Sequence, residues 1–254
     1  MDLKNSTVLV TGATSGIGKA TAVACHKEGA RIVAVARRKE RLDALAKELG
    51  EKRVHAVACD IADAQAYGAA LKSLPADFAA VDVLVNNAGL ALGKDPYAQV
   101  PWEDIARMVE VNVTGLLQGT RAILPGMLER GRGHVINLGS TAGVWPSPGN
   151  AVYGATKAFV RQFSLALRAD LLGTPIRVTE IEPGMAETEF SMVRYKGDKT
   201  KADAFYAGMT PMEAGDIADA ILWAVTRPAR VNVNTMQIMP VDQAFAPLAI
   251  HRRK

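Results

Sequence analysis

Tyr153 and Lys157 stand four residues apart in the segment Y-G-A-T-K, which contains no proline. In a helix, residues at this spacing lie on one face, one turn apart. A lysine ammonium beside a phenol lowers the pKa of the phenol from its ordinary value of about 10. A tyrosine placed in this way could exchange a proton with an alcohol or carbonyl oxygen near neutral pH. The same spacing also occurs in ordinary helices with a solvated lysine, so the remaining chain has to support the chemical interpretation.

The composition is typical of a soluble globular protein. Of 254 residues, 49% are apolar and 22% are charged, which fits one α/β domain over residues 1–254. No run reaches the roughly 18 uninterrupted apolar residues of a membrane span, so we expect no membrane partner. The first residues lack a signal-peptide layout, because their apolar run is short and leads directly into a predicted strand.

Cysteine and histidine usage gives no indication of a metal. Cys25 and Cys59 are the only cysteines, and their spacing matches no metal motif. Free thiols without a disulfide framework are typical of a reducing compartment, so we expect a cytoplasmic protein. The four histidines are scattered along the chain, and we therefore expect a site without a metal ion.

The formal net charge of +4 comes from local clusters of basic residues, at 37–41, 194–201 and 251–254. Nucleic-acid binding would require a stripe of Lys and Arg interleaved with aromatic residues, and the chain has none. We therefore expect no nucleic-acid partner. The first two clusters are better explained as sites for small anions, and His251 to Lys254 as a solvated end.

Short apolar runs alternate with segments of helical periodicity. Strands are predicted at 7–11, 31–36, 53–59, 81–87, 133–139, 175–183 and 234–241. Helices are predicted at 19–29, 37–50, 63–73, 101–129, 152–172 and 212–228. This alternation implies right-handed crossovers and a parallel sheet that is covered by helices on both faces. We predict an α/β, Rossmann-type doubly wound domain with about seven strands.

In such sheets ligands bind at the carboxyl ends of the strands, and the first strand ends at the glycine-rich turn T-G-A-T-S-G-I-G. Three glycines allow a tight turn, close approach of the backbone to a pyrophosphate, and close packing of helix on strand. The free N–H groups at the start of the helix attract the anion. The residues expected to contact a dinucleotide are Gly12, Thr14, Ser15, Gly16, Ile17 and Gly18. A merely structural turn is the alternative, and the strand–turn–helix context favours the dinucleotide.

Arg37 and Arg38 follow the second strand, where NAD enzymes usually place an acidic residue for the adenosine ribose. Guanidinium groups at this position are suited to a 2′-phosphate, which an arginine can bind with two hydrogen bonds. Cations at a helix start also oppose the helix dipole unless an anion accompanies them. We therefore expect NADP(H) as the cofactor rather than NAD(H).

Polar residues also follow the third and fourth predicted strands. Asp60, followed by Ile61, could contact the adenine or cap the next helix; Asp63 is the better cap, so Asp60 is assigned to the adenine. The segment Asn87-Ala88-Gly89 combines a side-chain amide with a turn, and cofactor contact and turn chemistry can coexist there.

Taken together, these motifs resemble the short-chain dehydrogenase/reductase family. The matching residues are TGATSGIG, NNAG, Asn112 in NVTG, Ser140 in INLGS, Tyr153 to Lys157, and Pro183-Gly184, in the order and spacing of the family. Within the family, ARRKERL (36–42), EPGMAETEFSMVRYKGD (182–198) and NVNTMQIMPVDQ (232–243) are similar to bacterial NADP-dependent serine and 3-hydroxy acid dehydrogenases.

The resemblance implies a catalytic tetrad of Asn112, Ser140, Tyr153 and Lys157. Tyr153 would act as the general acid/base, and Ser140 would hydrogen-bond the same substrate oxygen. Lys157 would lower the pKa of Tyr153 and also bind the nicotinamide ribose. Asn112 would hold a water that links Lys157 to solvent. The alternatives are a turn hydroxyl for Ser140 and a buried amide at a helix kink for Asn112; the complete set favours catalysis.

Pro183 and Gly184 open a segment near 185–210 that in the family contacts the nicotinamide and covers the substrate. Thr188 matches the position that binds the carboxamide. The rest of the segment is polar without strong periodicity, and we expect a flexible lid. Arg194 is the residue expected to hold a substrate carboxylate, because its fork can bind both oxygens. A solvated loop is the alternative for the whole basic stretch.

The expected activity is interconversion of a hydroxyl and a carbonyl, on a small 3-hydroxy acid of the serine, allo-threonine or 3-hydroxyisobutyrate type. A broad carbonyl or ketoacyl reductase and a sugar-uronate reductase are alternatives within the family. A regulatory dinucleotide-binding protein without catalysis is less compatible with the tetrad. The resemblance also implies a homotetramer, with Pro240 and Phe245 near an interface.

Overall fold

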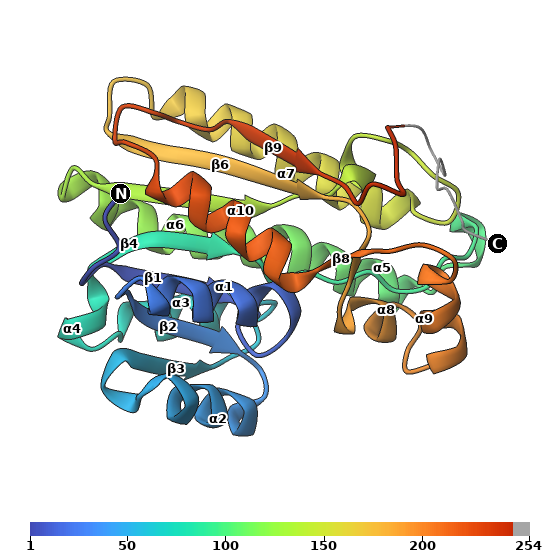
Figure 1. The fold of residues 1–254 in the computed structure, drawn as a ribbon, viewed down its shortest axis with the longest axis horizontal. Helices are drawn as coiled ribbons and strands as arrows, with labels where there is room; N and C mark the ends of the chain where they lie inside the picture. The colour runs from blue at the N-terminus through green and yellow to red at the C-terminus, as the bar shows by residue number, and fades with distance from the viewer. Residues whose placement is uncertain (246–254) are drawn as a thin grey trace.

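Seven parallel strands form the central sheet, in the order β3-β2-β1-β4-β5-β6-β9 (Figure 1). The computed structural model describes residues 1–245, so the tail at His251 to Lys254 lies outside the described residues. The strands are β1 (Thr7–Thr11), β2 (Arg31–Ala36), β3 (Val54–Ala58), β4 (Val81–Asn86), β5 (Gly133–Leu138), β6 (Ile176–Pro183) and β9 (Thr235–Ile238). The prediction of an α/β doubly wound fold is confirmed. The strand order reverses between β1 and β4, where such folds bind ligands.

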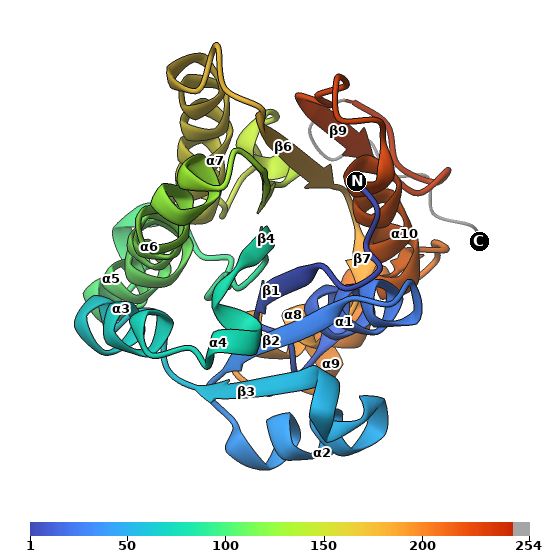
Figure 2. The ribbon, with the colours of Figure 1, turned by 90° about the vertical axis from the view of Figure 1, so that its left-hand side faces the viewer.

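Helices cover both faces of this sheet (Figure 2). One face carries α1 (Gly16–Lys27), α2 (Lys39–Leu49) and α10 (Ala214–Thr226). The other carries α3 (Ala64–Lys72), α4 (Ala76–Ala79), α5 (Trp102–Val109), α6 (Leu116–Glu129) and α7 (Ala151–Asp170). Two short 3-10 turns, η1 (Glu51–Arg53) and η2 (Tyr97–Gln99), lie in the connections. No helix within residues 1–245 has both the length and the hydropathy of a membrane-spanning helix.

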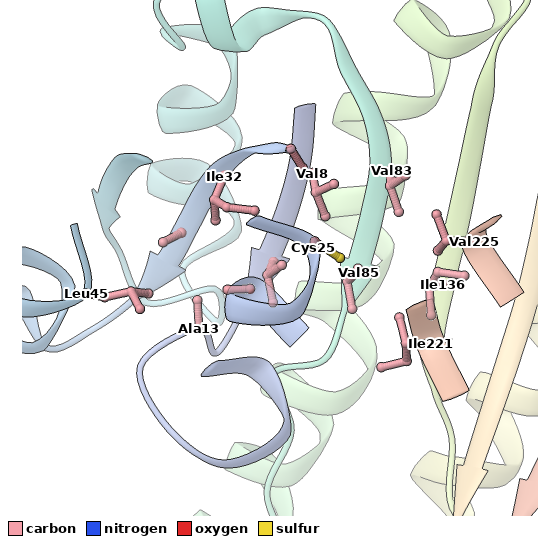
Figure 3. Close-up of a cluster of buried hydrophobic side chains, with 14 of the residues drawn as sticks. Val8, Ala13, Cys25, Ile32, Leu45, Val83, Val85, Ile136, Ile221 and Val225 are labelled. Atoms are coloured by element: carbon pink, nitrogen blue, oxygen red, sulfur yellow. The ribbon is translucent and has the colours of Figure 1, made fainter. Parts of the chain in front are cut away.

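Neighbouring residues of each central strand point to opposite faces and fill two separate cores. Val8 packs with the helices on the α1 side and Leu9 with those on the α7 side, and both are fully buried. Figure 3 shows strand residues such as Val8 and Val85 beside Cys25 of α1 and Ile221 of α10. This burial on both faces explains why the strands were recognisable as continuous apolar runs.

The helix predicted over 101–129 contains one irregular turn. Between α5 and α6 the backbone forms a π-helical turn, η3 (Glu110–Gly115), which carries Asn112. A π turn inserts an extra residue, changes the direction of the side chains within it, and is frequent at functional sites. The side chain of Asn112 points inward and is 2% exposed.

The segment predicted as a flexible lid contains two short helices, α8 (Glu189–Arg194) and α9 (Lys199–Tyr206). Side chains cap both helices: Thr188 accepts from the Phe190 N–H at 3.2 Å, and Asp198 from the Lys201 N–H at 3.1 Å. Two two-residue strands, β7 (Ala186–Glu187) and β8 (Met212–Glu213), pair at the base of the segment. The sequence showed no periodicity here because helices of six and eight residues are too short to display one.

A buried amide network joins α6 and α7 to the middle of the sheet. Asn137 of β5 donates to Ser164 of α7 at 2.9 Å, and Asn86 of β4 donates to Asn137 at 2.9 Å and to Thr120 of α6 at 3.0 Å. Buried polar groups of this kind are costly when unpaired, so they restrict how α7 can sit on the sheet. The helix that carries Tyr153 and Lys157 is therefore held in place by polar contacts as well as by apolar packing.

Candidate functional site

A cavity of about 290 Å³ opens at the carboxyl edge of the sheet and collects most of the residues singled out from the sequence. The predicted residues that line it are Gly12, Thr14, Ser15, Gly16, Ile17, Arg37, Arg38, Asp60, Ile61, Asn87, Ala88, Gly89, Ser140, Tyr153, Lys157, Pro183, Gly184 and Thr188. Gly18 and Asn112 lie behind its wall rather than in it. Arg194 lines a neighbouring cavity of about 150 Å³, which shares Ser140 and Tyr153 with the first.

The glycine turn after β1 is closed so tightly that side chains would not fit. Gly12 and Gly16 have φ angles of 69° and 49°, in the left-handed region that favours glycine. A Cβ on Gly18 would collide with the carbonyl oxygen of Gly12 and with the side-chain amide of Asn87. Ser15 precedes α1 and gives it no side-chain cap, and no acidic residue occupies the first turn. The free N–H groups of this helix start are thus available to an anion.

Arg38 is part of an ion-pair cluster that the sequence did not reveal. Its guanidinium lies 3.3 Å from Glu189 of α8, and it also donates to Thr14 at 3.4 Å and Ser15 at 3.3 Å. Arg41 pairs with the same Glu189 at 2.7 Å. Partial burial favours the neutral acid, but hydrogen bonds from Arg41 and Arg38 outweigh it and hold the pKa of Glu189 below its ordinary value.

The ion pairs with Glu189 remove one reason to expect a 2′-phosphate beside Arg38. The cations at the start of α2 do not require a ligand to balance the helix dipole, because Glu189 supplies a negative charge. Arg37 lines the cavity and is exposed. The position of both arginines beside the glycine turn still suits an anionic ligand.

Asp60 and Asp63, which follow β3, have different roles. Asp63 accepts from the Ala66 N–H at 2.9 Å and caps α3, which confirms that part of the prediction. Asp60 lines the cavity and pairs with Arg107 of α5 at 2.7 Å. Partial burial opposes ionisation of Asp60, but the Ala62 N–H and Arg107 hold its pKa below the ordinary value. Arg107 itself lines the cavity, and the sequence had not pointed to it.

The segment after β4 is fastened to the end of β1. The side-chain amide of Asn87 donates to the Thr11 carbonyl at 2.8 Å, and the Thr11 hydroxyl accepts the N–H groups of Asn87 and Ala88 at 3.0 and 2.9 Å. Turn chemistry is therefore present, and the same residues also line the cavity. These bonds join the ends of β1 and β4, the two strands between which the strand order reverses.

Tyr153 and Lys157 are both buried, with 9% and 5% of their surface exposed. The Lys157 ammonium donates to the Leu138 carbonyl at 2.7 Å and lies 5.9 Å from the centre of the Tyr153 ring. Burial lowers the pKa of Lys157 to about 8, and the nearby Glu180 opposes that effect.

The sequence-based expectation for the Tyr153 pKa is wrong in this structure. Burial raises the pKa of Tyr153 above its ordinary value, and the opposing effects come first from the Arg194 guanidinium and then from a hydrogen bond with Ser140. Helical spacing predicted that Lys157 lies near the phenol but not how strongly the site is desolvated. The cation that acts most on the phenol is contributed by the lid.

Ser140 serves a turn and faces Tyr153 at the same time. Its hydroxyl accepts the Ala142 N–H at 3.1 Å and caps the short 3-10 turn η4 (Thr141–Gly143). The same side chain lies near enough to the Tyr153 phenol to lower its pKa. The two interpretations of Ser140 are thus compatible.

Asn112 is held by three hydrogen bonds. Its amide oxygen accepts the Leu90 N–H at 2.8 Å, and its amide nitrogen donates to the Leu90 carbonyl at 2.8 Å and to Thr156 at 3.0 Å. A Cβ on Gly89 would lie 3.3 Å from both the Asn112 oxygen and the Lys157 nitrogen, so Gly89 separates these two groups. The amide satisfies the backbone beside the π turn, and a role in holding water stays a prediction.

Arg194 is buried, so the alternative of a solvated loop does not apply to it. It is 4% exposed, and its guanidinium carbon lies 5.2, 5.1 and 5.5 Å from the ring centres of Tyr153, Phe190 and Phe205. The Nε of Arg194 has no hydrogen-bond partner among the described residues. Lys199 and Lys201, in contrast, are exposed and pair with Asp203 and Asp198. Arg194 therefore brings a buried positive charge against the Tyr153 ring.

Glu189 and Arg107 could not have been found from the sequence, because their partners are distant along the chain. Arg41 and Glu189 are separated by 148 positions, and Asp60 and Arg107 by 47. No sequence pattern indicates such pairs. Within residues 1–245, no group of three His, Cys, Asp or Glu side chains lies close enough together to hold a metal ion.

Residues 6–199 match the family model described as short chain dehydrogenase. The NADP-dependent 3-hydroxy acid dehydrogenase YdfG of Salmonella typhi is 53% identical over 246 residues, which are 96% of this chain and 99% of that protein. The serine 3-dehydrogenase of Rhizobium radiobacter is 51% identical, over 98% of this chain and 99% of that protein. Among solved structures, the closed form of serine dehydrogenase complexed with NADP+ superimposes with a TM-score of 0.93. It is 50% identical, over 97% of this chain and 100% of that one.

Proposed function

The chain belongs to the short chain dehydrogenase family, and we propose that it is an NADP(H)-dependent oxidoreductase that interconverts a hydroxyl and a carbonyl on a small 3-hydroxy acid. Serine, allo-threonine and 3-hydroxyisobutyrate are the substrate types that we expect. The observation that carries the proposal is that Tyr153, Lys157 and Ser140 line the same cavity as the glycine turn. An acid/base group and a dinucleotide cradle are thus brought to one place.

The residues around the glycine turn fit a dinucleotide. The space above Gly12 and Gly18 is closed to any side chain, and the start of α1 offers uncapped N–H groups to a pyrophosphate. Arg37 and Arg38 would hold the 2′-phosphate, and Asp60 with Ile61 the adenine. The nicotinamide half would be held by Asn87, Ala88, Gly89, Tyr153, Lys157, Pro183, Gly184 and Thr188. When bound, NADP(H) supplies or accepts the hydride.

Proton transfer is assigned to Tyr153. Its phenol takes the proton of the substrate hydroxyl during oxidation and returns it to the carbonyl oxygen during reduction. Ser140, which lines the cavity beside the phenol, holds the same substrate oxygen. The Arg194 guanidinium favours the phenolate that burial disfavours. Lys157 binds the ribose, and Asn112 orders the water that connects it to solvent.

Arg194 supports an anionic substrate. It is a buried cation, its Nε has no partner among the described residues, and it lies beside Tyr153 at the boundary of the two cavities. A carboxylate held there would accept charge-assisted hydrogen bonds in a desolvated site. A broad carbonyl or ketoacyl reductase would not need this charge, whereas a sugar-uronate reductase could use it, so the uronate remains the second candidate.

Tyr153→Phe tests the proposed activity. The variant lacks the transferable proton, so we expect kcat to fall by a factor of about 10³ or more, because general acid/base catalysis contributes about 10²–10⁴ and the phenol also orients the oxygen. The Kd of NADPH should stay within a few-fold. The assay follows NADP+ reduction with a panel of 3-hydroxy acids, uronates and neutral alcohols. A variant that keeps most of its kcat would exclude Tyr153 as the acid/base, and a wild-type preference for neutral alcohols would exclude the 3-hydroxy acid.

Arg38→Ala tests the choice of cofactor. Charge-assisted hydrogen bonds contribute about 1.5–3 kcal/mol, so we expect kcat/KM for NADPH to fall at least about tenfold while the value for NADH changes little. Lys39→Ala is the matched control, because Lys39 is exposed and pairs with Asp43. The assignment fails if wild-type kcat/KM for NADH equals or exceeds that for NADPH.

Arg194→Ala tests the carboxylate site. We expect KM for a 3-hydroxy acid to rise about tenfold or more from the lost charge-assisted bonds, and KM for an uncharged alcohol to stay the same. The uncharged alcohol also reports any loss of packing against Tyr153, Phe190 and Phe205. Lys199→Ala, an exposed change in the same segment, is the control. Because Arg194 also acts on the Tyr153 phenol, kcat can fall for both substrates. An equal rise in KM for both would refute the carboxylate site.

We also infer a cytoplasmic homotetramer. Cys25 and Cys59 are free thiols, as a reducing compartment would favour. The edge strand β9 is half-buried throughout, and exposed edge strands are usually protected by pairing or by a partner. Val241 and Phe245 are exposed just beyond it, whereas Pro240 is buried. Sedimentation equilibrium should give four times the mass of 27.0 kDa, and a monomer at micromolar concentration would contradict the assembly.

A further inference from the structure

Two glutamates of β6, Glu180 and Glu182, lie within the protein behind the helix that carries Lys157. They are two residues apart on one strand, so their side chains point to the same face of the sheet. Their exposed fractions are 0% and 1%. That face is covered by α7, whose Arg161 lies 3.5 Å from Glu182. No step of the proposed reaction uses either carboxyl group.

The carboxyl oxygens have too few donors for two ionised groups. Both oxygens of Glu180 and one oxygen of Glu182 lack a hydrogen-bond partner among the described residues. The other oxygen of Glu182 accepts from the Gln237 amide of β9 at 2.9 Å. On the neighbouring strand β5, Asn137 is paired with Glu180, but its amide nitrogen donates to Ser164 and its oxygen accepts from Asn86. Gly139 follows β5, and a Cβ there would collide with the Glu180 carboxyl. An ionised carboxylate can only accept, so a buried one without donors is strongly unfavourable.

We infer that Glu180 is a neutral carboxylic acid that donates its proton to Glu182, and that this pair acts as a positioning group for Lys157. A shared proton gives a partner to one oxygen of each carboxyl group, and it leaves the pair with one negative charge. Arg161 balances that charge. The first half of the inference concerns the folded chain alone, and the second half rests on the proposed function.

The electrostatics agree with this arrangement. Burial raises the pKa of Glu180 to about 8; the neighbouring Glu182 acts in the same direction, and Arg161 and Lys157 oppose it. The charged groups that face Glu180 are Glu182 on its own strand and Lys157 and Arg161 on α7. The neighbouring strands add only uncharged amides, Gln237 from β9 and Asn137 from β5. Glu180 in turn opposes the fall in the Lys157 pKa that burial causes.

The pair and Lys157 therefore titrate as one system. At neutral pH Glu180 is uncharged, and the pair presents a constant single charge to Lys157. As pH rises through the pKa of Glu180, that group ionises and a second negative charge favours the Lys157 ammonium. Glu180 thus extends, towards alkaline pH, the range over which Lys157 remains protonated and can bind a ribose oxygen.

Glu180→Gln tests the shared proton through the pH dependence of the free energy of unfolding. Between the ordinary glutamate pKa of about 4.5 and the raised value, folded wild type binds one more proton than the unfolded chain, so its stability falls as pH rises. The variant lacks this proton. The ratio of the unfolding equilibrium constants, wild type over variant, should therefore rise about tenfold per pH unit between about pH 5 and 7.5. Glu129→Gln, an exposed change at the end of α6, is the control and should leave the pH dependence unchanged. Parallel pH profiles of wild type and Glu180→Gln would overturn the inference.

A measurement on the wild-type protein keeps the test independent of how the variant folds. The infrared spectrum at pH 7 should contain the carbonyl stretch of a protonated carboxylic acid, and this band should disappear above the pKa of Glu180. A spectrum without the band at pH 7 would also overturn the shared proton. Neither measurement requires that the protein be an oxidoreductase.

The effect of the glutamate pair on Lys157 is tested by the pH profile of kcat/KM. Glu180→Gln keeps a neutral donor towards Glu182, so kcat/KM at pH 7 should stay within about two-fold. The alkaline decline should begin at lower pH than in wild type, because the second negative charge no longer forms beside Lys157. An unchanged alkaline limb would overturn the role towards Lys157 and leave the shared proton standing. A wild type without turnover would refute the proposed function instead.

Discussion

The buried ammonium of Lys157 is the constraint on which the site depends. It is held by one short hydrogen bond to the Leu138 carbonyl, at the end of the strand that leads to Ser140. This contact joins α7 to the end of β5, and Tyr153 and Ser140 line the same cavity beside it. Desolvation of a cation is expensive, and the neighbouring Glu180 opposes its effect on the pKa of Lys157. Lys157 thus links α7 to the end of β5, while the charge that acts most on the Tyr153 phenol comes from Arg194 of the lid.

Glycines on either side of Ser140 allow close backbone contact around the site. A Cβ on Gly143 would lie 2.6 Å from the Lys157 carbonyl carbon, so η4 can rest directly on the backbone of α7 only because glycine is there. Gly139 gives room to the Glu180 carboxyl in the same way. Gly139 and Gly143, on either side of Ser140, thus approach Glu180 of β6 and the backbone of α7 more closely than larger residues could. Rigid placement of the hydroxyl follows from these contacts.

The sequence predicted the fold well because each strand is buried on both faces and ends in a turn residue. The apolar run of 31–36 coincides with β2, and the glycine turn after β1 could be recognised from its place between a strand and a helix. The sequence could not predict interactions that arise only when distant segments meet. Arg194 was placed in a polar lid, yet the structure buries it against Tyr153, and the sign of the Tyr153 pKa shift was missed because spacing carries no information on desolvation. Resemblance to a family provided the order of the catalytic residues, whereas Glu180 and Glu189 emerged only from the structure.

The contact of Glu189 with Arg38 and Arg41 joins the lid to α2 across the first cavity. These side chains are between 39% and 47% exposed, so dissolved ions reach them and weaken their attraction. Any anion that occupies Arg38 also competes with Glu189 for it, and by linkage each of the two weakens the other. The first residue of α8 is thus attached through a contact that responds to ionic strength, while its last residue, Arg194, accepts a backbone hydrogen bond from Gly93 that salt screens far less. The helix that carries Arg194 to the Tyr153 ring therefore has one salt-sensitive end and one salt-insensitive end.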